Sequence, residues 1–523
     1  MKRKISNLFL SVAIIAVILT GCNSTIKEQS SKDVQKEKVL TYGTANVSET
    51  GRINPALDEH AEIHKLIFTG LTKHDKEGKV VPDLAKEWTF DERTNTYDFK
   101  LNEGVKWQDG EEFTAEDVKF TIESIKNPNN ASEIKSNYEE IESVEVIDKY
   151  NVKLHLKSPC VAVLDYLSVG MLPKHLLEGK NLNNNEFNQN PVGTGPYKFD
   201  KWEVGQYIQL VSNKNYYNNT LNIDKVIFKI IKDEKVRAMQ LKSGEIDLAQ
   251  LEPKDTEVFE DIEGIKLYRE KTADYRGVMY NFNNDLFKNK EVIKALNYAV
   301  NRQDIVDSVL NGMGKVAYGP LQMSTYNNED VEKYEYNPQK SKEILVQNGW
   351  KLNEDNVFEK DGKTLSFKLT CFEGDPVRVN MSNIVSHQFK KIGVEAKVDI
   401  QSEIDWENLE SFLIGWGSPY DPDDHTYKVF HSSQIESGMN LNAYTNKKVD
   451  DFITKGRTTL KEEDRKQYYM DFQKELALDP PFTFLAYIDA VYGAKNNIVG
   501  IEDTVLGHHG VGFLWNIEEW DIK

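Results

Sequence analysis

Two histidines near the N-terminal third of the sequence have the spacing of a metal site. His60 and His64 stand four positions apart, so their side chains would share one face of a helix. Two imidazoles in this arrangement can bind one transition-metal ion. The same pattern also suits two solvated histidines on an acidic helix, so both interpretations stay open.

A second stretch, residues 415–433, combines aromatic, acidic and imidazole side chains in the sequence GWGSPYDPDDHTYKVFHSS. Its glycines and prolines predict a loop. Trp416 and Tyr420 are large aromatic residues, and Asp421 and His431 follow them. Aromatic faces with a few polar groups are typical of small-molecule pockets, whereas the alternative is an ordinary packed loop.

A ligand that carries a carboxylate needs a cationic partner, and a bidentate arginine is the usual one. Arg276 stands beside Tyr275 at the start of a strand-like stretch, and Arg378 precedes a helical pattern that begins near residue 380. Either arginine could instead be a surface residue paired with a carboxylate. His508 and His509 occupy a glycine-flanked turn, where we expect structural or exposed side chains.

The sequence contains no recognisable catalytic motif. The stretch HAEIH at 60–64 has its glutamate out of place for a zinc protease, and the Gly-Lys-Thr at 362–364 lacks the upstream glycine of a phosphate-binding loop, since residue 357 is valine. We therefore expect no enzyme and no required cofactor.

Short strands and helices alternate along the chain. Alternating apolar residues predict strands at 151–157, 207–213 and 225–231, and helical periodicity covers 289–310 and 380–393. The second helix runs through a glycine into a strand at 394–400, a succession that suits a crossover onto a parallel sheet. Together these elements indicate an α/β fold.

The N-terminus has the order of an export signal. Three cations, Lys2 to Lys4, precede an apolar run from Leu8 to Leu19 and then Gly21 and Cys22. The run is shorter than the ~20 residues of a membrane-spanning helix, so we expect a cleaved signal peptide at 1–21. The polar stretch 22–38 predicts a flexible tether. A formal charge of −19 argues against nucleic acid as a partner.

A resemblance to a known family rests on several segments. Residues 83–120 (DLAKEWTFDERTNTYDFKLNEGVKWQDGEEFTAEDVKF) contain two turns, a strand at YDFKL, and Thr114 and Asp117 as a helix cap. This segment resembles the signature of the peptide/nickel solute-binding proteins, family 5. Segments at 190–217, 237–249, 295–306, 336–350 and 416–425 are also similar.

The resemblance implies a two-lobed α/β fold of the periplasmic-binding-protein kind, of the large cluster C type, with a hinge of two crossing strands. The first lobe would comprise residues 39–276 and 487–523, with an extra subdomain at about 67–190. The second lobe would comprise residues 277–486. Ligands of such proteins are buried when the lobes close.

The resemblance also implies a function: an extracytoplasmic receptor that delivers a solute to ABC permease subunits. Cys22 matches a bacterial lipobox, so the mature chain would be anchored to the outer face of the cell membrane by an acylated cysteine. We expect a monomer and place an oligopeptide-like ligand first. A nickel or other metal-chelate ligand, with the ion as part of the ligand, is the alternative, and a sensor without transport is the third.

Individual residues match the nickel-chelate branch and the peptide-binding branch of the family to different extents. Trp416 and Tyr420 correspond to cleft-lining residues of the nickel-chelate branch, and His431 lies in the following loop, where a histidine can bind the metal. The arginine of that branch is absent after residues 151–157. The aspartate that binds a peptide's α-amine is replaced by Ser418 and Pro419, although Asp421 stands close by.

Overall fold

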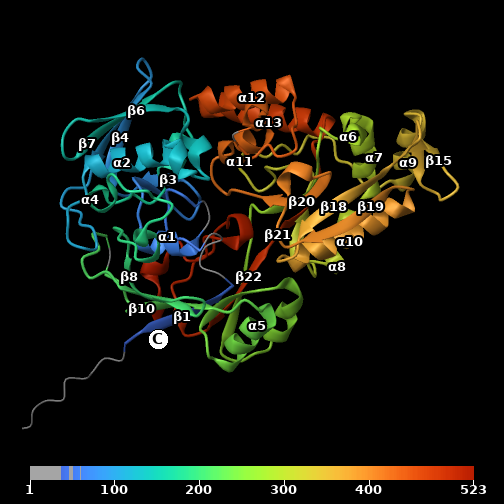
Figure 1. Ribbon diagram of the computed structural model, residues 1–523. Helices are drawn as coiled ribbons and strands as arrows, with labels where there is room; N and C mark the ends of the chain where they lie inside the picture. The colour runs from blue at the N-terminus through green and yellow to red at the C-terminus, as the bar shows by residue number, and fades with distance from the viewer. Residues whose placement is uncertain (1–36, 46–50, 59–60, 219, 437) are drawn as a thin grey trace, which may run out of the picture. The chain divides into compact units, whose positions relative to one another are not determined.

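The computed structural model describes residues 37–45, 51–58, 61–218, 220–436 and 438–523 (Figure 1). The chain divides into two compact units, Met1–Glu37 and Lys38–Lys523, and everything below concerns the second. The expected signal peptide, Cys22, nearly all of the tether and His60 lie outside the described residues. Within the described part of the chain, every helix is too short or too polar to cross a membrane.

The first lobe is built on a seven-stranded sheet in the order β12-β22-β11-β1-β10-β9-β8. Its strands β1, β9 and β10 bury alternate residues, as expected of strands with one covered face. Helix α5 (Glu234–Ser243) packs on β11 and β1. The strands are β1 (Val39–Thr44), β8 (Tyr197–Glu203), β9 (Tyr207–Ser212), β10 (Lys225–Ile230), β11 (Leu248–Leu251), β12 (Ile265–Glu270) and β22 (Ala490–Lys495).

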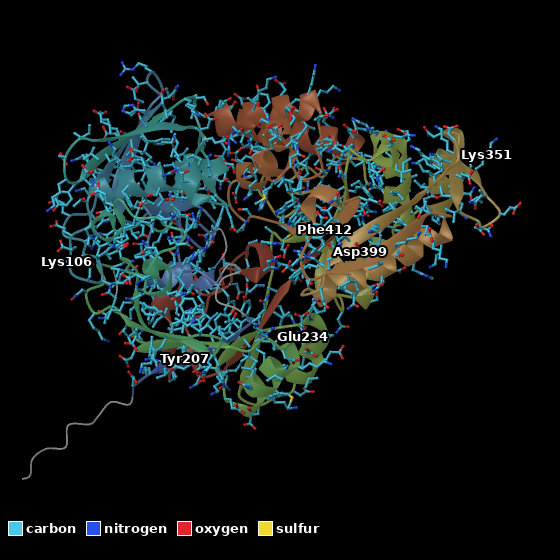
Figure 2. The ribbon with its side chains drawn as sticks, in the orientation of Figure 1. Lys106, Tyr207, Glu234, Lys351, Asp399 and Phe412 are labelled. Atoms are coloured by element: carbon cyan, nitrogen blue, oxygen red, sulfur yellow. The ribbon has the colours of Figure 1, made fainter. Side chains whose placement is uncertain are left out.

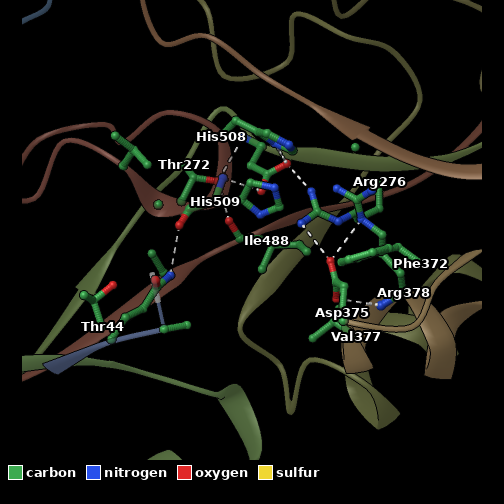
Figure 3. Close-up of a pocket in the computed structure, with 18 of the residues that line it drawn as sticks. Thr44, Thr272, Arg276, Phe372, Asp375, Val377, Arg378, Ile488, His508 and His509 are labelled. Atoms are coloured by element: carbon green, nitrogen blue, oxygen red, sulfur yellow. Dashed lines mark hydrogen bonds and ion pairs between the residues drawn. The ribbon is translucent and has the colours of Figure 1, made fainter. Parts of the chain in front are cut away.

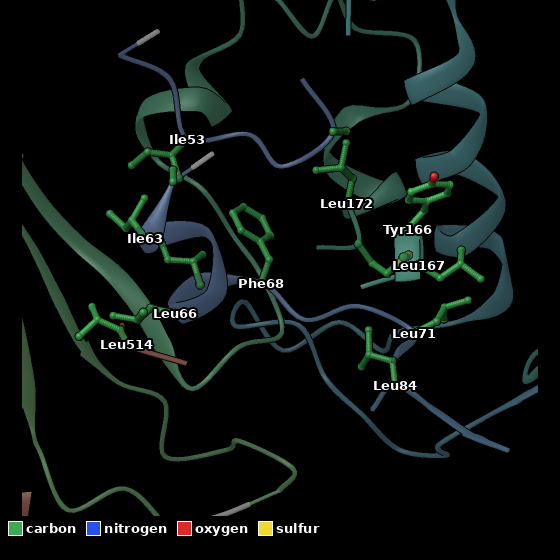
Figure 4. Packing of buried hydrophobic residues seen from close by; sticks show 14 of the residues in the cluster. Ile53, Ile63, Leu66, Phe68, Leu71, Leu84, Tyr166, Leu167, Leu172 and Leu514 are labelled. Carbon is green, nitrogen blue, oxygen red and sulfur yellow. The ribbon is translucent and has the colours of Figure 1, made fainter. Parts of the chain in front are cut away.

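A smaller sheet, in the order β4-β5-β7-β6, and helix α2 form a subdomain in this lobe. Its elements are β4 (Ala85–Asp91), β5 (Thr96–Leu101), α2 (Ala115–Lys126), β6 (Ile141–Val146) and β7 (Asn151–Leu156). Helix α1 (Glu62–Ile67) is part of the same hydrophobic core, with Ile63 and Leu66 completely buried (Figure 4). This core fixes the position of α1 beside the cleft described below.

The second lobe is built on a six-stranded sheet in the order β14-β21-β13-β20-β18-β19. Strands β18 and β19 are parallel and joined by α10, which confirms the predicted crossover. Figure 2 shows Phe412 and Asp399 on this sheet. The strands are β13 (Tyr275–Tyr280), β14 (Gly314–Val316), β18 (Ser366–Phe372), β19 (Glu395–Gln401), β20 (Ser411–Trp416) and β21 (Phe482–Ile488).

Helices cover this sheet and extend the lobe (Figure 1). They are α6 (Asp285–Lys288), α7 (Lys290–Ala299), α8 (Arg302–Ser308), α9 (Pro338–Gln347), α10 (Pro376–Lys391), α11 (Asp423–Phe430), α12 (Lys447–Thr458) and α13 (Glu462–Leu478).

The helix predicted at 289–310 is two helices, α7 and α8, separated at Val300 and Asn301. The break is stabilised by Arg302, whose buried guanidinium donates to the carbonyl oxygens of Asn297 and Tyr334 at 3.2 and 2.7 Å. The bond to Asn297 satisfies a carbonyl oxygen that a continuous helix would pair internally. Helix α10 also begins four residues before the expected start, because Asp375 caps it ahead of a proline.

Two short segments join the lobes. The chain changes sheet between Glu270, the end of β12, and Tyr275, the start of β13, and again between Ile488 and Ala490. Lys271 and Asp489, one on each segment, form an ion pair at 2.6 Å. The crossing segments thus lie side by side, as the hinge of a two-lobed receptor requires.

Candidate ligand-binding cleft

A cleft with a volume of about 990 Å³ is lined by residues of both lobes. The first lobe contributes residues of β1, α1, β11 and the C-terminal segment, and the second contributes residues of β20 and the start of α10. Charged groups dominate its polar lining: seven carboxylates, namely Asp58, Glu62, Glu133, Glu252, Asp274, Asp375 and Asp489, and three arginines, namely Arg237, Arg276 and Arg378.

His508 and His509 form the centre of the first-lobe wall. Asp274, in the first crossing segment, accepts from the His509 backbone nitrogen at 3.0 Å and lies 2.8 Å from Nδ1 of His508. One side-chain ligand atom from each of these three residues lies within 4.8 Å of the others, a grouping that could hold a metal ion. The cluster therefore offers two imidazoles: the ring of His508 is oriented by the Asp274 carboxylate, and the backbone of His509 is held by the same residue.

The turn that carries the two histidines is tightly held. His509 and Gly510 both have left-handed backbone conformations, with φ of 56° and 74°. Gln250 donates to the carbonyl oxygen of His509 at 3.1 Å, and Tyr492 donates to that of Gly510 at 3.0 Å. Because both partners lie on the seven-stranded sheet, the histidines are positioned by the first lobe.

Arg276 connects this cluster to the second lobe (Figure 3). Its guanidinium pairs with Asp274, and its other terminal nitrogen lies 3.7 Å from Asp375. Arg378 pairs with the same Asp375 oxygen at 3.0 Å. Burial opposes ionisation of Asp375, but the charges of the two arginines nevertheless lower its pKa. The result is a buried chain of alternating charges that runs across the cleft wall.

Glu252 is a cleft carboxyl group whose protonation state changes near neutral pH. Burial, followed by the negative charges of Glu234 and Asp375, raises its pKa to about 7. The charge of the cleft therefore becomes more negative as the pH rises through neutrality.

Trp416, Arg276 and Arg378, three of the residues predicted as ligand contacts, line the cleft. Trp416 is 9% exposed and stacks on Phe482 with ring centroids 6.2 Å apart. Tyr275 does not line it, because its ring is completely buried against Phe484 at 5.2 Å. The part that each plays in ligand binding stays a prediction.

Tyr420 and Asp421 lie outside the cleft lining. The Tyr420 ring stacks on His74 of the first lobe, with centroids 3.7 Å apart, and its hydroxyl accepts from Lys65 at 3.1 Å. Asp421 forms a buried ion pair with Arg465 at 2.5 Å. The structure therefore uses these residues to join the lobes and to stabilise the second lobe.

A group of contacts around Tyr420, here called the interlobe contact, continues along α11. Tyr166 of the first lobe donates to Asp423 at 2.8 Å, and Asn137 donates to Asp424 at 3.0 Å. Burial, followed by the charge of Lys65, lowers the pKa of His74 to about 3, so this imidazole is neutral in the interface. The lobes thus touch at the hinge and again at this separate surface.

Two of the predicted metal ligands, His431 and His64, lie apart from the histidine cluster. His431 ends α11 and lies 2.8 Å from the Ser433 hydroxyl and 3.3 Å from that of Thr454. His64 is buried in α1 with its ring edge toward Phe68, 6.3 Å between centroids. His60 is not among the described residues.

Sequence reasoning missed His508, His509 and Asp274. The turn places the two histidines on the cleft wall, with His508 only 7% exposed. The sequence GHHGVG at 507–512 contained a signal, because three glycines around adjacent histidines favour a tight turn whose side chains are held in fixed directions.

Comparison with known proteins identifies the family. The family model described as "Bacterial extracellular solute-binding proteins, family 5 Middle" matches residues 79–437. The oligopeptide-binding protein AppA of Bacillus subtilis (strain 168) is 33% identical over 552 residues, covering 99% of each chain. The nickel-binding periplasmic protein of Escherichia coli (strain K12) is 26% identical, covering 92% of this chain and 94% of that protein.

Two crystal structures share the fold closely. NikZ from Campylobacter jejuni, in complex with Ni(L-His), superposes with a TM-score of 0.88 at 44% identity, covering 92% of this chain and 99% of that one. AppA from Bacillus subtilis, in complex with a nonapeptide, superposes with a TM-score of 0.84 at 32% identity and covers 93% and 99%. The expected two-lobed α/β fold is confirmed, and the chain belongs to family 5 of the bacterial extracellular solute-binding proteins.

Proposed function

We propose that this receptor captures a transition-metal chelate, of the kind formed by nickel and histidine, and delivers it to the permease of an ABC importer. The grouping of Asp274, His508 and His509 on the cleft wall carries the proposal. Imidazole nitrogens suit nickel and neighbouring metals. The metal is cargo here, and the two imidazoles would complete a coordination sphere that the chelator fills only in part.

The charge of the cleft supports a cationic cargo. Seven carboxyl groups and three guanidinium groups line it. The carboxylates outnumber the arginines even when Glu252 is neutral, so the electrostatic potential inside favours positive ions. Arg276 lies beside the histidines, since it and His508 contact the same Asp274 oxygen, and Arg378 lies next along the same wall (Figure 3). A carboxylate of the chelator could bind to these arginines. A metal bound to an amino acid carries both kinds of charge.

The similarity to NikZ of Campylobacter jejuni, which was solved with Ni(L-His), supports the same ligand class at 44% identity. A peptide is the second candidate. The cleft volume of about 990 Å³ lies at the upper end for small-molecule pockets, and AppA was solved with a nonapeptide.

Isothermal titration calorimetry of the mature chain distinguishes the two candidates. The titrants are Ni(II) with L-histidine, Ni(II) alone and a nonapeptide. We expect Ni(II) with L-histidine to bind most tightly, and His508→Ala and His509→Ala to weaken it by about tenfold or more. His387→Ala is the matched control, because His387 is exposed on α10 and does not line the cleft.

Two outcomes would decide against the chelate. Binding of the nonapeptide without binding of Ni(II) and L-histidine would establish the second candidate. Equal affinity of the His508→Ala, His509→Ala and wild-type proteins for the nickel complex would remove the histidine cluster from the site. His431→Ala and His64→Ala test the two predicted ligands that lie outside the cluster, and His60→Ala tests the one that is not among the described residues.

The proposal includes the site of action. We infer that Cys22 is acylated and holds the mature chain on the outer face of the cell membrane, from the lipobox-like sequence before it. Cys22→Ser should release the protein from the membrane fraction in a cell fractionation experiment. Unchanged membrane association of that variant would contradict the anchor.

A further inference from the structure

Glu62, the first residue of α1, has one carboxylate oxygen bound and one without a partner. Its Oε1 accepts from the backbone nitrogens of Gly512 and Phe513 at 2.5 and 2.8 Å. Its Oε2 is buried and has no hydrogen-bond partner within the described part of the chain. The residue is only 8% exposed, yet it lines the cleft.

The hydrogen-bonded oxygen, Oε1, positions the turn that carries His508 and His509. Gly512 and Phe513 follow closely after His508 and His509, so the bonds to Oε1 attach this segment to α1. The helix itself is held in the subdomain core by Ile63 and Leu66. Glu62 therefore lies at the junction of two rigid elements on the first-lobe wall, and its side chain has little freedom to turn elsewhere.

An unpartnered buried carboxylate oxygen is energetically costly. Buried carboxylates in native proteins are normally paired or fully hydrogen-bonded, and each missing partner destabilises the folded state. Burial raises the pKa of Glu62, although backbone donors of Gly512, Phe513 and Leu514 and the charge of Lys65 act in the opposite direction. An N–H donor from the cleft would remove this penalty.

We propose that Oε2 of Glu62 accepts a hydrogen bond from an amino nitrogen of the ligand and makes the receptor select ligands with a free amino group. This rests on the proposed function and adds the recognition of a defined ligand atom. The nitrogen would be the metal-bound amine of a chelating amino acid or, for a peptide, the terminal ammonium group. Both present N–H donors to the same oxygen.

The substitution Glu62→Gln separates the two oxygens. The amide oxygen can still accept from Gly512 and Phe513, whereas the amide nitrogen in place of Oε2 cannot accept at all. Glu62→Ala removes both functions. Glu123→Gln, on the exposed face of α2, is the matched control for a lost surface carboxylate.

The test compares three nickel complexes whose ligands differ in the number of N–H donors on the metal-bound amine. Nα-methylhistidine retains one N–H on the metal-bound amine, and Nα,Nα-dimethylhistidine retains none, while all three histidines chelate Ni(II). We expect the wild-type protein to lose affinity by about tenfold or more at the dimethyl step, since a hydrogen bond to a charged group is lost. Glu62→Gln should bind the L-histidine complex about tenfold more weakly and discriminate less between it and the dimethyl complex.

Each result decides between defined possibilities. If wild-type protein binds none of the nickel complexes, the proposed function fails, and the same test is made with a peptide and its N-acetylated form. If wild-type protein binds them but Glu62→Gln discriminates as strongly as wild type, the role of Oε2 is wrong. An equal loss for all three complexes would leave Glu62 with positioning alone, which also overturns the proposal. The wild-type series needs no variant, so it stays decisive if Glu62→Gln does not fold.

Discussion

Replacement of Tyr420 by alanine should weaken ligand binding although Tyr420 does not line the cleft. The variant removes a ring stacked on His74 at 3.7 Å and the acceptor for Lys65 at 3.1 Å. An aromatic pair contributes about 0.5–1.5 kcal/mol and a hydrogen bond about 0.5–1.5 kcal/mol. Because both contacts exist only when the lobes meet, the closed state should lose about 1–3 kcal/mol.

A penalty of that size reduces the population of the binding-competent state by about 5- to 150-fold. The dissociation constant for Ni(II) with L-histidine, measured by calorimetry, should rise by the same factor. Tyr420→Phe should produce only the part due to the hydroxyl. Without ligand, small-angle X-ray scattering should give Tyr420→Ala a radius of gyration equal to or larger than that of the wild type.

The control is Tyr336→Ala, which removes a tyrosine that is 42% exposed. Its dissociation constant should match that of the wild type. The reasoning is refuted if Tyr420→Ala binds within twofold of the wild type while its thermal unfolding is unchanged, because the interlobe contact would then make no contribution to closure.

Two further predictions concern stability and pH. Arg465→Met should lower the free energy of unfolding by about 3–5 kcal/mol in chemical denaturation, because it leaves Asp421 charged and buried without its partner at 2.5 Å. The double variant with Asp421→Asn should lose less stability than the sum of the two single variants. Simple additivity would contradict the pairing. The carboxyl of Glu252, with a pKa of about 7, is neutral below that pH and anionic above it, so affinity for the nickel complex should increase from pH 6 to 8 and the increase should be smaller in Glu252→Gln. An equal increase in both proteins would assign the pH dependence to another group.

Features governed by local sequence were predictable. Thr114 and Asp117 were expected to cap a helix, and α2 begins at Ala115 with the Thr114 nitrogen donating to Asp117 at 2.9 Å. The predicted strands at 151–157, 207–213 and 225–231 are β7, β9 and β10. Such elements depend on alternation, turns and caps within a few residues, and these patterns are visible in one chain.

Positions that depend on distant partners were not predictable. Tyr420 and Trp416 were predicted to share a loop and looked equivalent, yet Trp416 ends strand β20 and lines the cleft, whereas Tyr420 meets His74 more than three hundred residues away in sequence. Asp421 is likewise directed by Arg465 on α13. His508 and His509 reach the site only because Asp274 and the strands beneath them fix the turn. Nothing in the local pattern specifies these tertiary contacts.

The position of Asp274 has a consequence for the order of events in capture. The residue lies in a crossing segment, and atoms near a rotation axis move least when two bodies turn about it. His508 and His509 belong to the same lobe as the strands that hold them, so opening should leave these donors assembled and facing the medium. Encounter with cargo would then be governed by the open receptor, whereas the second lobe, which brings Trp416 and Arg378, would determine the residence time.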